Sequence, residues 1–257
     1  MLYVFFFILG LAVGSFLNCV IYRLEKKESF IGGRSYCPYC KKTLSWFELI
    51  PLMSFILQKG KCKHCKKPIS LQYPLVELAT GILFVLCVWY FFPNFLLSTF
   101  YFLLSTFLIV IFVYDLKHYI IPDQVIYPAI LVAGIWYSVF GIFIRDTKYE
   151  ILTTLLAALA AGAFFLFIVL ISRGKWMGVG DIKLALFMGL VLGWPKILVA
   201  LFLAFLIGAF TSILLIILKK KTLKSEIPFG PFLVGGTIIA IFWGNVLINW
   251  YFGLIFL

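Results

Sequence analysis

Long runs of apolar residues dominate this chain, and short polar segments separate them. Eight runs are candidates for membrane helices: 2–21, 74–92, 95–115, 124–144, 150–172, 181–193, 196–218 and 232–256. A helix needs about 20 apolar residues to cross the hydrocarbon layer of a bilayer. The pattern therefore predicts an all-α polytopic membrane protein with about eight transmembrane helices. The run at 181–193 is short, so we expect that helix to be tilted or sheltered by its neighbours.

Composition supports this interpretation. Hydrophobic residues make up 64% of the 257 positions and charged residues only 12%, whereas soluble domains usually carry about 25% charged residues. The first run has no basic segment ahead of it and no small-x-small cleavage site before Arg23. These features are typical of a retained first helix and not of a removable signal peptide.

The net charge of +12 is distributed in a way that indicates orientation. If the N-terminus lies outside the cell, the only Lys and Arg residues left outside are Arg145, Lys148 and Lys196. Cytoplasmic loops of membrane proteins carry such an excess of positive charge. We therefore expect a cytoplasmic membrane protein whose basic loops face the cytoplasm and contact anionic lipid, with no nucleic acid as a partner.

Only residues 22–73 form a segment long enough to fold outside the bilayer. We predict three parts: a first transmembrane helix (1–21), a basic cytoplasmic segment (22–73) and a seven-helix membrane domain (74–257). The sequence gives no sign of an internal repeat.

Four cysteines of the cytoplasmic segment form two C-x2-C pairs, Cys37/Cys40 and Cys62/Cys65. Two such pairs can direct four thiolates to one point, which predicts a closed tetrahedral zinc site with a structural role. A cytoplasmic position disfavours structural disulfides. Four unrelated thiols or a redox pair remain the alternative. We interpret His64, between the second pair, as a bystander.

Two aspartates lie at the ends of apolar runs. Asp115 ends the third run and Asp181 begins the sixth, and the predicted topology places both at the cytoplasmic face. Ionisable groups at membrane depth are costly, so they are candidates for function. Neighbouring carboxyls share one proton, which supplies a base to activate water and an acid to protonate a leaving amine. Gly178 and Gly180, before Asp181, would let a substrate backbone approach closely.

Each of these aspartates also has a structural interpretation. Asp181 is a suitable helix N-cap, and Asp115 could anchor a helix end at the interface. Asp123 follows Pro122 directly before the fourth run, where capping is the better interpretation. Position alone leaves these alternatives open.

An ordered set of motifs extends over nearly the whole chain. It comprises Gly14–Asn18, the two cysteine pairs around Trp46–Pro51, Tyr73–Glu77, Asp115 followed by Pro122-Asp123, Gly178–Asp181, and Ile227–Pro231. In this order the motifs resemble those of type IV prepilin peptidases, which are bifunctional leader peptidases and N-methyltransferases. The motif Gly178-Val179-Gly180-Asp181 alone is weak, but the ordered set is specific.

The resemblance implies eight helices, prepilin or pseudopilin substrates, and S-adenosylmethionine as methyl donor. It implies that Asp115 and Asp181 are catalytic, that Asp123 is secondary, and that Gly178, Gly180 and Pro122 belong to the peptidase motifs. The chain departs from the family pattern at Glu25, Leu49 and Gln72, where proline, asparagine and arginine are usual. All three lie in or beside the segment generally associated with methyl transfer, whereas the peptidase motifs are intact.

Two other classes of function account for part of the pattern. The first is a proton-coupled transporter in which Asp115 and Asp181 relay protons. A protein of this class is expected to have inverted repeats and broken helices near the midplane of the bilayer. A membrane scaffold with a zinc module would account for the cysteines, but it leaves Gly178–Asp181 unexplained. We therefore expect a membrane aspartic peptidase with structural zinc.

Overall fold

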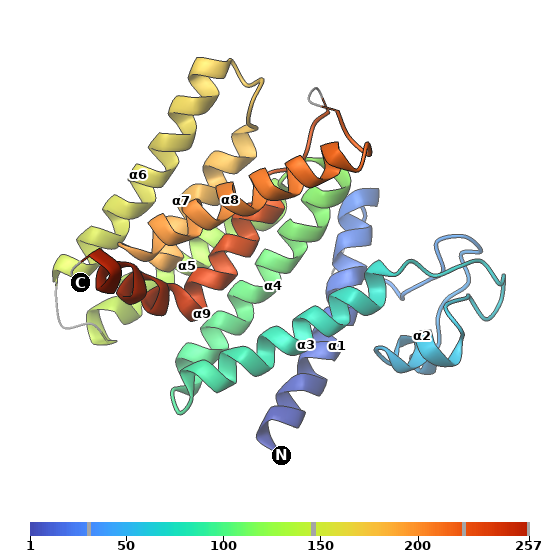
Figure 1. Ribbon diagram of the computed structural model, residues 1–257. Helices are drawn as coiled ribbons and strands as arrows, with labels where there is room; N and C mark the ends of the chain where they lie inside the picture. The colour runs from blue at the N-terminus through green and yellow to red at the C-terminus, as the bar shows by residue number, and fades with distance from the viewer. Residues whose placement is uncertain (30–31, 145–147, 223–224, 256–257) are drawn as a thin grey trace. The chain divides into compact units, whose positions relative to one another are not determined.

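A computed structural model describes residues 1–29, 32–144, 148–222 and 225–255, and within these ranges the chain forms helices and loops but no strand. Eight long helices account for most of it (Figure 1). They are α1 (Leu2–Lys26), α3 (Gln72–Phe91), α4 (Phe95–His118), α5 (Asp123–Ile144), α6 (Lys148–Ser172), α7 (Val179–Leu192), α8 (Lys196–Ile217) and α9 (Gly230–Ile255). Each matches one predicted apolar run, which confirms the all-α fold.

Six helices in the described residues are long and apolar enough to cross a membrane: α1, α3, α4, α6 over Leu152–Ser172, α8, and α9 over Gly230–Leu254. The chain is thus a multi-pass membrane protein. Helices α5 and α7 are not among the six, so the count of eight spans stays a prediction. Of the basic residues expected outside, Arg145 lies beyond the described residues, and so does the side chain of Lys148.

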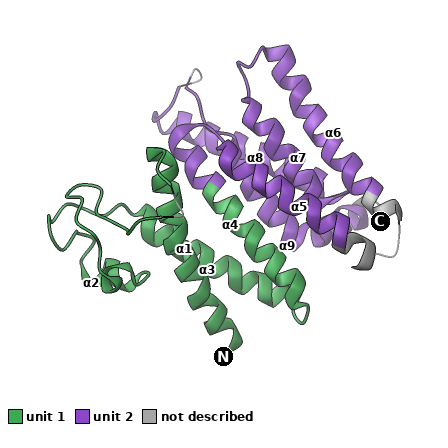
Figure 2. Ribbon diagram, turned by 180° about the vertical axis from the view of Figure 1, so that it is seen from behind, with its two compact units in different colours: residues 1–110 green, residues 111–257 purple. Residues whose placement is uncertain are grey.

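The chain divides into two compact units, Met1–Val110 and Ile111–Leu257 (Figure 2). The first unit holds α1, α3, the first part of α4, and two short helices, η1 (Trp46–Leu49) and α2 (Met53–Leu57). The second unit holds the end of α4 and helices α5 to α9. The expected division at residues 21 and 73 stays a prediction. Helix α1 continues past residue 21 to Lys26.

Close packing of α1 against α3 organises the first unit. A Cβ added at Gly10 would lie 2.7 Å from the Cα of Gly81, and one added at Gly14 would lie 2.7 Å from the Cα of Glu77. Small residues let helix backbones approach in this way where lipid supplies no hydrophobic drive. Asn18, one turn beyond Gly14, donates from Nδ2 to the carbonyl of Tyr73 over 3.0 Å.

Helix α7 is the most enclosed helix of the second unit, with Leu184, Phe187 and Met188 completely buried. Gly189 lies directly against the backbone of Ala158 on α6, where any added Cβ would overlap it. In the first turn of α7, Asp181 is buried while Val179 is 61% exposed.

Candidate active site and metal centre

The two aspartates of the peptidase motifs are both buried in the second unit. Asp115 lies in the last turn of α4 and Asp181 in the first turn of α7, and the two residues are only 4% and 8% exposed. The Asp115 carboxyl is close enough to Asp181 to interact with it electrostatically. Helix packing therefore places two buried carboxyls near each other from distant parts of the sequence.

Backbone N–H groups orient both carboxyls. Gly178 donates to Oδ2 of Asp181 over 3.1 Å, and Gly230, at the start of α9, donates to the Asp115 carboxyl. A Cβ at Gly230 would overlap that carboxyl, so only glycine allows this approach. The N-cap of α7 is Gly178, and Asp181 is the third residue of the helix. Asp181 therefore accepts a backbone N–H at the helix start, as the capping interpretation predicts, but it is not the N-cap residue itself. Gly230 was missed as a site residue, although it lies within the recognised motif Ile227–Pro231.

Asp123 does not join the buried pair. It begins α5, its side chain is 59% exposed, and its Oδ1 lies 2.6 Å from Nζ of Lys183 on α7. The ammonium group of Lys183 also lies 4.8 Å from the ring centre of Tyr127. The ion pair with Lys183, which sequence interpretation did not predict, links the start of α5 to the turn that follows Asp181.

Pro122 and Gly180 shape the connection between these two helix starts. The carbonyl of Pro122 accepts the backbone N–H groups of Val125 and Ile126, at 3.0 and 3.1 Å, which completes the first turn of α5. Gly180 packs on Ile121, and an added Cβ would lie 3.0 Å from the Cβ of that residue. The glycine thus serves helix packing in this structure.

The four cysteines of the first unit form one cluster. Their sulfur atoms all lie within 4.8 Å of one another, and Sγ of Cys37 is 3.9 Å from Sγ of Cys65. Zinc bonds of about 2.3 Å in a tetrahedron would separate the sulfurs by roughly 3.8 Å. None of the four forms a disulfide. The donor set therefore fits a metal ion such as zinc, and four thiolates would leave no open position on it.

The two cysteine pairs have the same backbone geometry. In each pair the first cysteine donates its N–H to a lysine carbonyl five residues later, Cys37 to Lys42 at 3.0 Å and Cys62 to Lys67 at 2.9 Å. Lys41 and Lys66 both adopt the left-handed conformation, with φ of 58° and 59°. The expectation of no internal repeat was wrong. The pattern Cys-x-x-Cys-Lys-Lys-x-Leu/Ile-Ser at 37–45 and 62–70 is its signal in the sequence.

Backbone donors favour the thiolate form at one of these positions. The N–H of Cys65, followed by that of His64, lowers the pKa of Cys62 to about 7. Thiolates are the form that binds a metal. Despite the N–H of Lys67, burial and the neighbouring thiols raise the pKa of Cys65 to about 11, so the fit of the donor set rests on the positions of the sulfurs.

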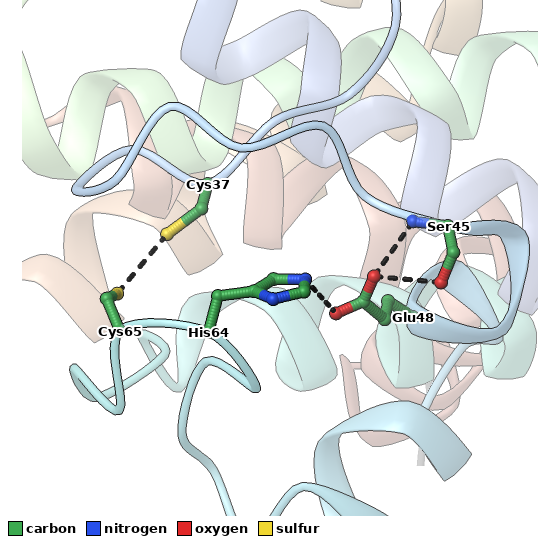
Figure 3. A network of polar contacts seen from close by, with 5 residues as sticks. All are labelled: Cys37, Ser45, Glu48, His64 and Cys65. Atoms are coloured by element: carbon green, nitrogen blue, oxygen red, sulfur yellow. Dashed lines mark hydrogen bonds and ion pairs between the residues drawn. The ribbon is translucent and has the colours of Figure 1, made fainter.

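His64 is not among the clustered ligands of the cysteine site, but it has a contact of its own beside the second pair. Its Nε2 lies 3.4 Å from Oε1 of Glu48, while Oε2 of Glu48 accepts from the N–H and the hydroxyl of Ser45 at 2.9 and 2.8 Å (Figure 3). The Ser45 N–H holds the pKa of Glu48 below its usual value. The contact links the second cysteine pair to helix η1.

Family models match both halves of the chain. The bacterial peptidase A24 N-terminal domain matches residues 8–91, and the type IV leader peptidase family matches residues 102–213. No solved structure matches the chain significantly.

Several curated proteins named prepilin leader peptidase/N-methyltransferase are similar over most of their length. One from Bacillus subtilis is 35% identical, covering 95% of this chain and 96% of the relative. Those from Legionella pneumophila and Aeromonas hydrophila are 31% and 32% identical, each covering 95% of this chain and 92% of the relative. The predicted family and the enzyme class that follows from it are thereby confirmed.

Proposed function

This chain belongs to the type IV leader peptidase family, and we propose that it cleaves the basic leader from prepilins or pseudopilins with Asp115 and Asp181 as its catalytic pair. The observation that supports the proposal is that both carboxyls are buried in the second unit, where the charge of Asp115 acts on Asp181. Asp123 is exposed and paired with Lys183, which supports a secondary role for it.

The proposed reaction follows from the shared proton of the pair. Two neighbouring carboxyls do not both ionise easily, so one stays protonated beside an ionised partner. The ionised group takes a proton from water as the water attacks the scissile carbonyl, and the protonated group donates to the carbonyl oxygen. A proton then passes to the leaving amine as the peptide bond breaks. The N–H groups of Gly178 and Gly230 keep the carboxyls in place during these transfers.

We also propose that the enzyme methylates the new N-terminus. The names of the relatives support this second activity. S-adenosylmethionine would supply the methyl group. The described residues contain no strand, and hence no glycine-rich strand–loop–helix cradle of the kind that binds nucleotides. No residue of this chain is therefore assigned to the donor.

The proposed metal is zinc, held by the four cysteines of the first unit with a structural role. Its proposed location is the cytoplasmic side, together with the active site, with the N-terminus outside. The distribution of lysine and arginine supports this orientation. Trypsin should cut at Lys219–Lys221 in inverted membrane vesicles but not in intact spheroplasts. Cutting in spheroplasts but not in inverted vesicles would contradict the proposed orientation.

The main test is incubation of the detergent-purified protein with a prepilin and S-adenosylmethionine, followed by mass spectrometry of the product. We expect a cleaved and methylated product from the wild type, and no cleavage by Asp115→Ala or Asp181→Ala. Cleavage at the wild-type rate by either variant would refute the aspartyl mechanism. A cleaved but unmethylated product would remove the second activity.

A further inference from the structure

The segment Trp46–Leu57, which comprises η1, α2 and the turn between them, exposes many apolar side chains. No residue of η1 or α2 is buried. The exposed apolar residues are Trp46, Phe47, Leu49, Ile50, Met53, Ile56 and Leu57, and Ile56 and Leu57 are 68% and 76% exposed. The rings of Trp46 and Phe47 stack on each other. Exposed apolar side chains concentrated in one short segment indicate contact with a membrane or another protein.

The only charged residue within this segment does not interrupt its apolar surface. Glu48 is that residue, and its carboxyl is engaged by Ser45 and by His64 (Figure 3). Its side chain is only 7% exposed. The segment therefore presents an uncharged surface, although it belongs to the most basic part of the chain.

Two polar contacts fix the segment beside the apolar part of the helix pair. The N–H of Leu52 donates to Oε2 of Glu77 on α3 over 2.8 Å, and the hydroxyl of Ser15 on α1 reaches the carbonyl of Leu49 at 3.5 Å. Ser15 lies roughly 16 Å along the helix from its end at Lys26, given the rise of an α-helix. In Figure 1, α2 accordingly lies beside the middle of α1 and not beyond its end.

The same contacts satisfy backbone groups that lipid cannot satisfy. Non-helical backbone at membrane depth is tolerated only where protein groups supply its hydrogen bonds. Leu52 has φ 59° and ψ −49°, outside a regular helix, and its N–H is taken up by the carboxyl of Glu77. This explains why a buried carboxyl occurs in the membrane helix α3.

From these observations we infer that residues 46–57 form an interfacial segment, which inserts its apolar side chains into the lipid leaflet on the side of the cysteine cluster. Apolar segments lie in this position when cationic residues flank them. The flanking lysines are Lys59, Lys61, Lys63, Lys66 and Lys67, which would contact anionic lipid headgroups. The occupant of this surface is thus the protein's own bilayer. The inference holds whether or not the proposed peptidase activity is correct.

The first test measures the depth of Trp46 in the full-length protein. Wild type and Trp46→Phe are placed in nanodiscs of phosphatidylcholine and phosphatidylglycerol, with or without brominated acyl chains, and the difference in their tryptophan emission isolates Trp46. We expect brominated lipid to remove most of this signal, and iodide in the buffer to leave it. Quenching by iodide alone would overturn the inference. Quenching by neither reagent would also overturn it, because a second copy or another protein would then cover the segment.

A second test removes apolar surface without touching the contacts of Ser15 and Glu77. The double variant Ile56→Ser/Leu57→Ser should make Trp46 accessible to iodide in the same nanodiscs. Tyr39→Ser is the matched control, since Tyr39 is an exposed aromatic residue of the cysteine segment outside residues 46–57. Unchanged protection in the double variant would contradict the insertion. Omitting phosphatidylglycerol should weaken quenching by brominated lipid, and equal quenching would remove the role of the lysines.

Discussion

The cysteine cluster and the aspartate pair are built in opposite ways. Each half of the cysteine cluster is a local turn, closed by backbone hydrogen bonds within six residues, and the same turn occurs twice. The aspartate pair instead depends on α4, α7 and α9: Asp115 of α4 contacts Gly230 of α9, and Asp181 of α7 contacts Gly178. A local site can therefore lose its metal with limited consequence elsewhere. A site assembled from helices is sensitive to small changes in their packing.

The largest expected effect is the loss of peptide cleavage without loss of zinc. Asp181→Asn keeps the shape of the side chain but cannot take a proton from water, so we expect cleavage of a prepilin to fall by about 10²–10⁴-fold. The zinc content, measured by elemental analysis, should stay at the wild-type level. Loss of zinc together with activity would show that the two sites are not independent.

The next effect tests the helix contact at Asp115. Gly230→Ala places a methyl group against the carboxyl, so we expect a loss of about 100-fold in cleavage rate, as for a reacting group displaced by about 1 Å. Gly235→Ala on the same helix is the matched control, because no atom lies within 4 Å of the added carbon. Equal rates for the two variants would refute the role assigned to Gly230.

A smaller effect on cleavage is expected from the cysteine cluster. Cys62→Ser removes one of four ligands, so zinc should be lost, and trypsin should cut more readily within residues 37–68. Cleavage of the prepilin should fall only a few-fold, since the metal has no part in the proposed reaction. Cys19→Ser, a free cysteine of α1, should keep its zinc. A complete loss of cleavage in Cys62→Ser would contradict the separation of the sites.

The smallest expected effect is the weakening of the contact between Glu48 and Ser45 at acidic pH. The N–H of Ser45 lowers the pKa of Glu48 in the folded chain from its ordinary value of 4.5. The contact therefore stabilises the folded chain at pH values above the pKa that Glu48 has in the unfolded chain. This stabilisation disappears as the pH falls through the lower pKa that Glu48 has in the folded chain. Amide hydrogen exchange over residues 45–64 should rise in acid more for the wild type than for Glu48→Gln. Identical acid dependence would rule the contact out.

The helices were predictable because a long apolar segment in a bilayer can satisfy its backbone hydrogen bonds in few structures other than a helix. The residues at which the helices end were harder to predict. Helix α1 continues to Lys26, and Arg23 turns back to donate to the carbonyls of Ser29 and Gly33 at 3.1 and 3.0 Å. Apolarity alone does not reveal that a buried arginine can extend a helix in this way.

The sites were predictable to different degrees for the same reason. Spacing was enough to propose the cysteine cluster, because its geometry is local. Sequence position could only nominate Asp115 and Asp181, since their meeting depends on tertiary packing. The contact of Gly230 and the ion pair of Lys183 with Asp123 were missed, because both join residues of different helices that no local pattern relates.

The length of α7 has a consequence for the supply of water. Its 14 residues extend roughly 21 Å, whereas the hydrocarbon layer is about 30 Å thick. A helix of this length cannot reach both surfaces, so at least one of its ends must meet other protein groups or solvent below the plane of the headgroups. Asp181 lies in the first turn of α7, at one of these two ends. A hydrolase inside a membrane needs its second reactant delivered there, and a short helix is one means of hydrating a reaction centre without opening a channel through the bilayer.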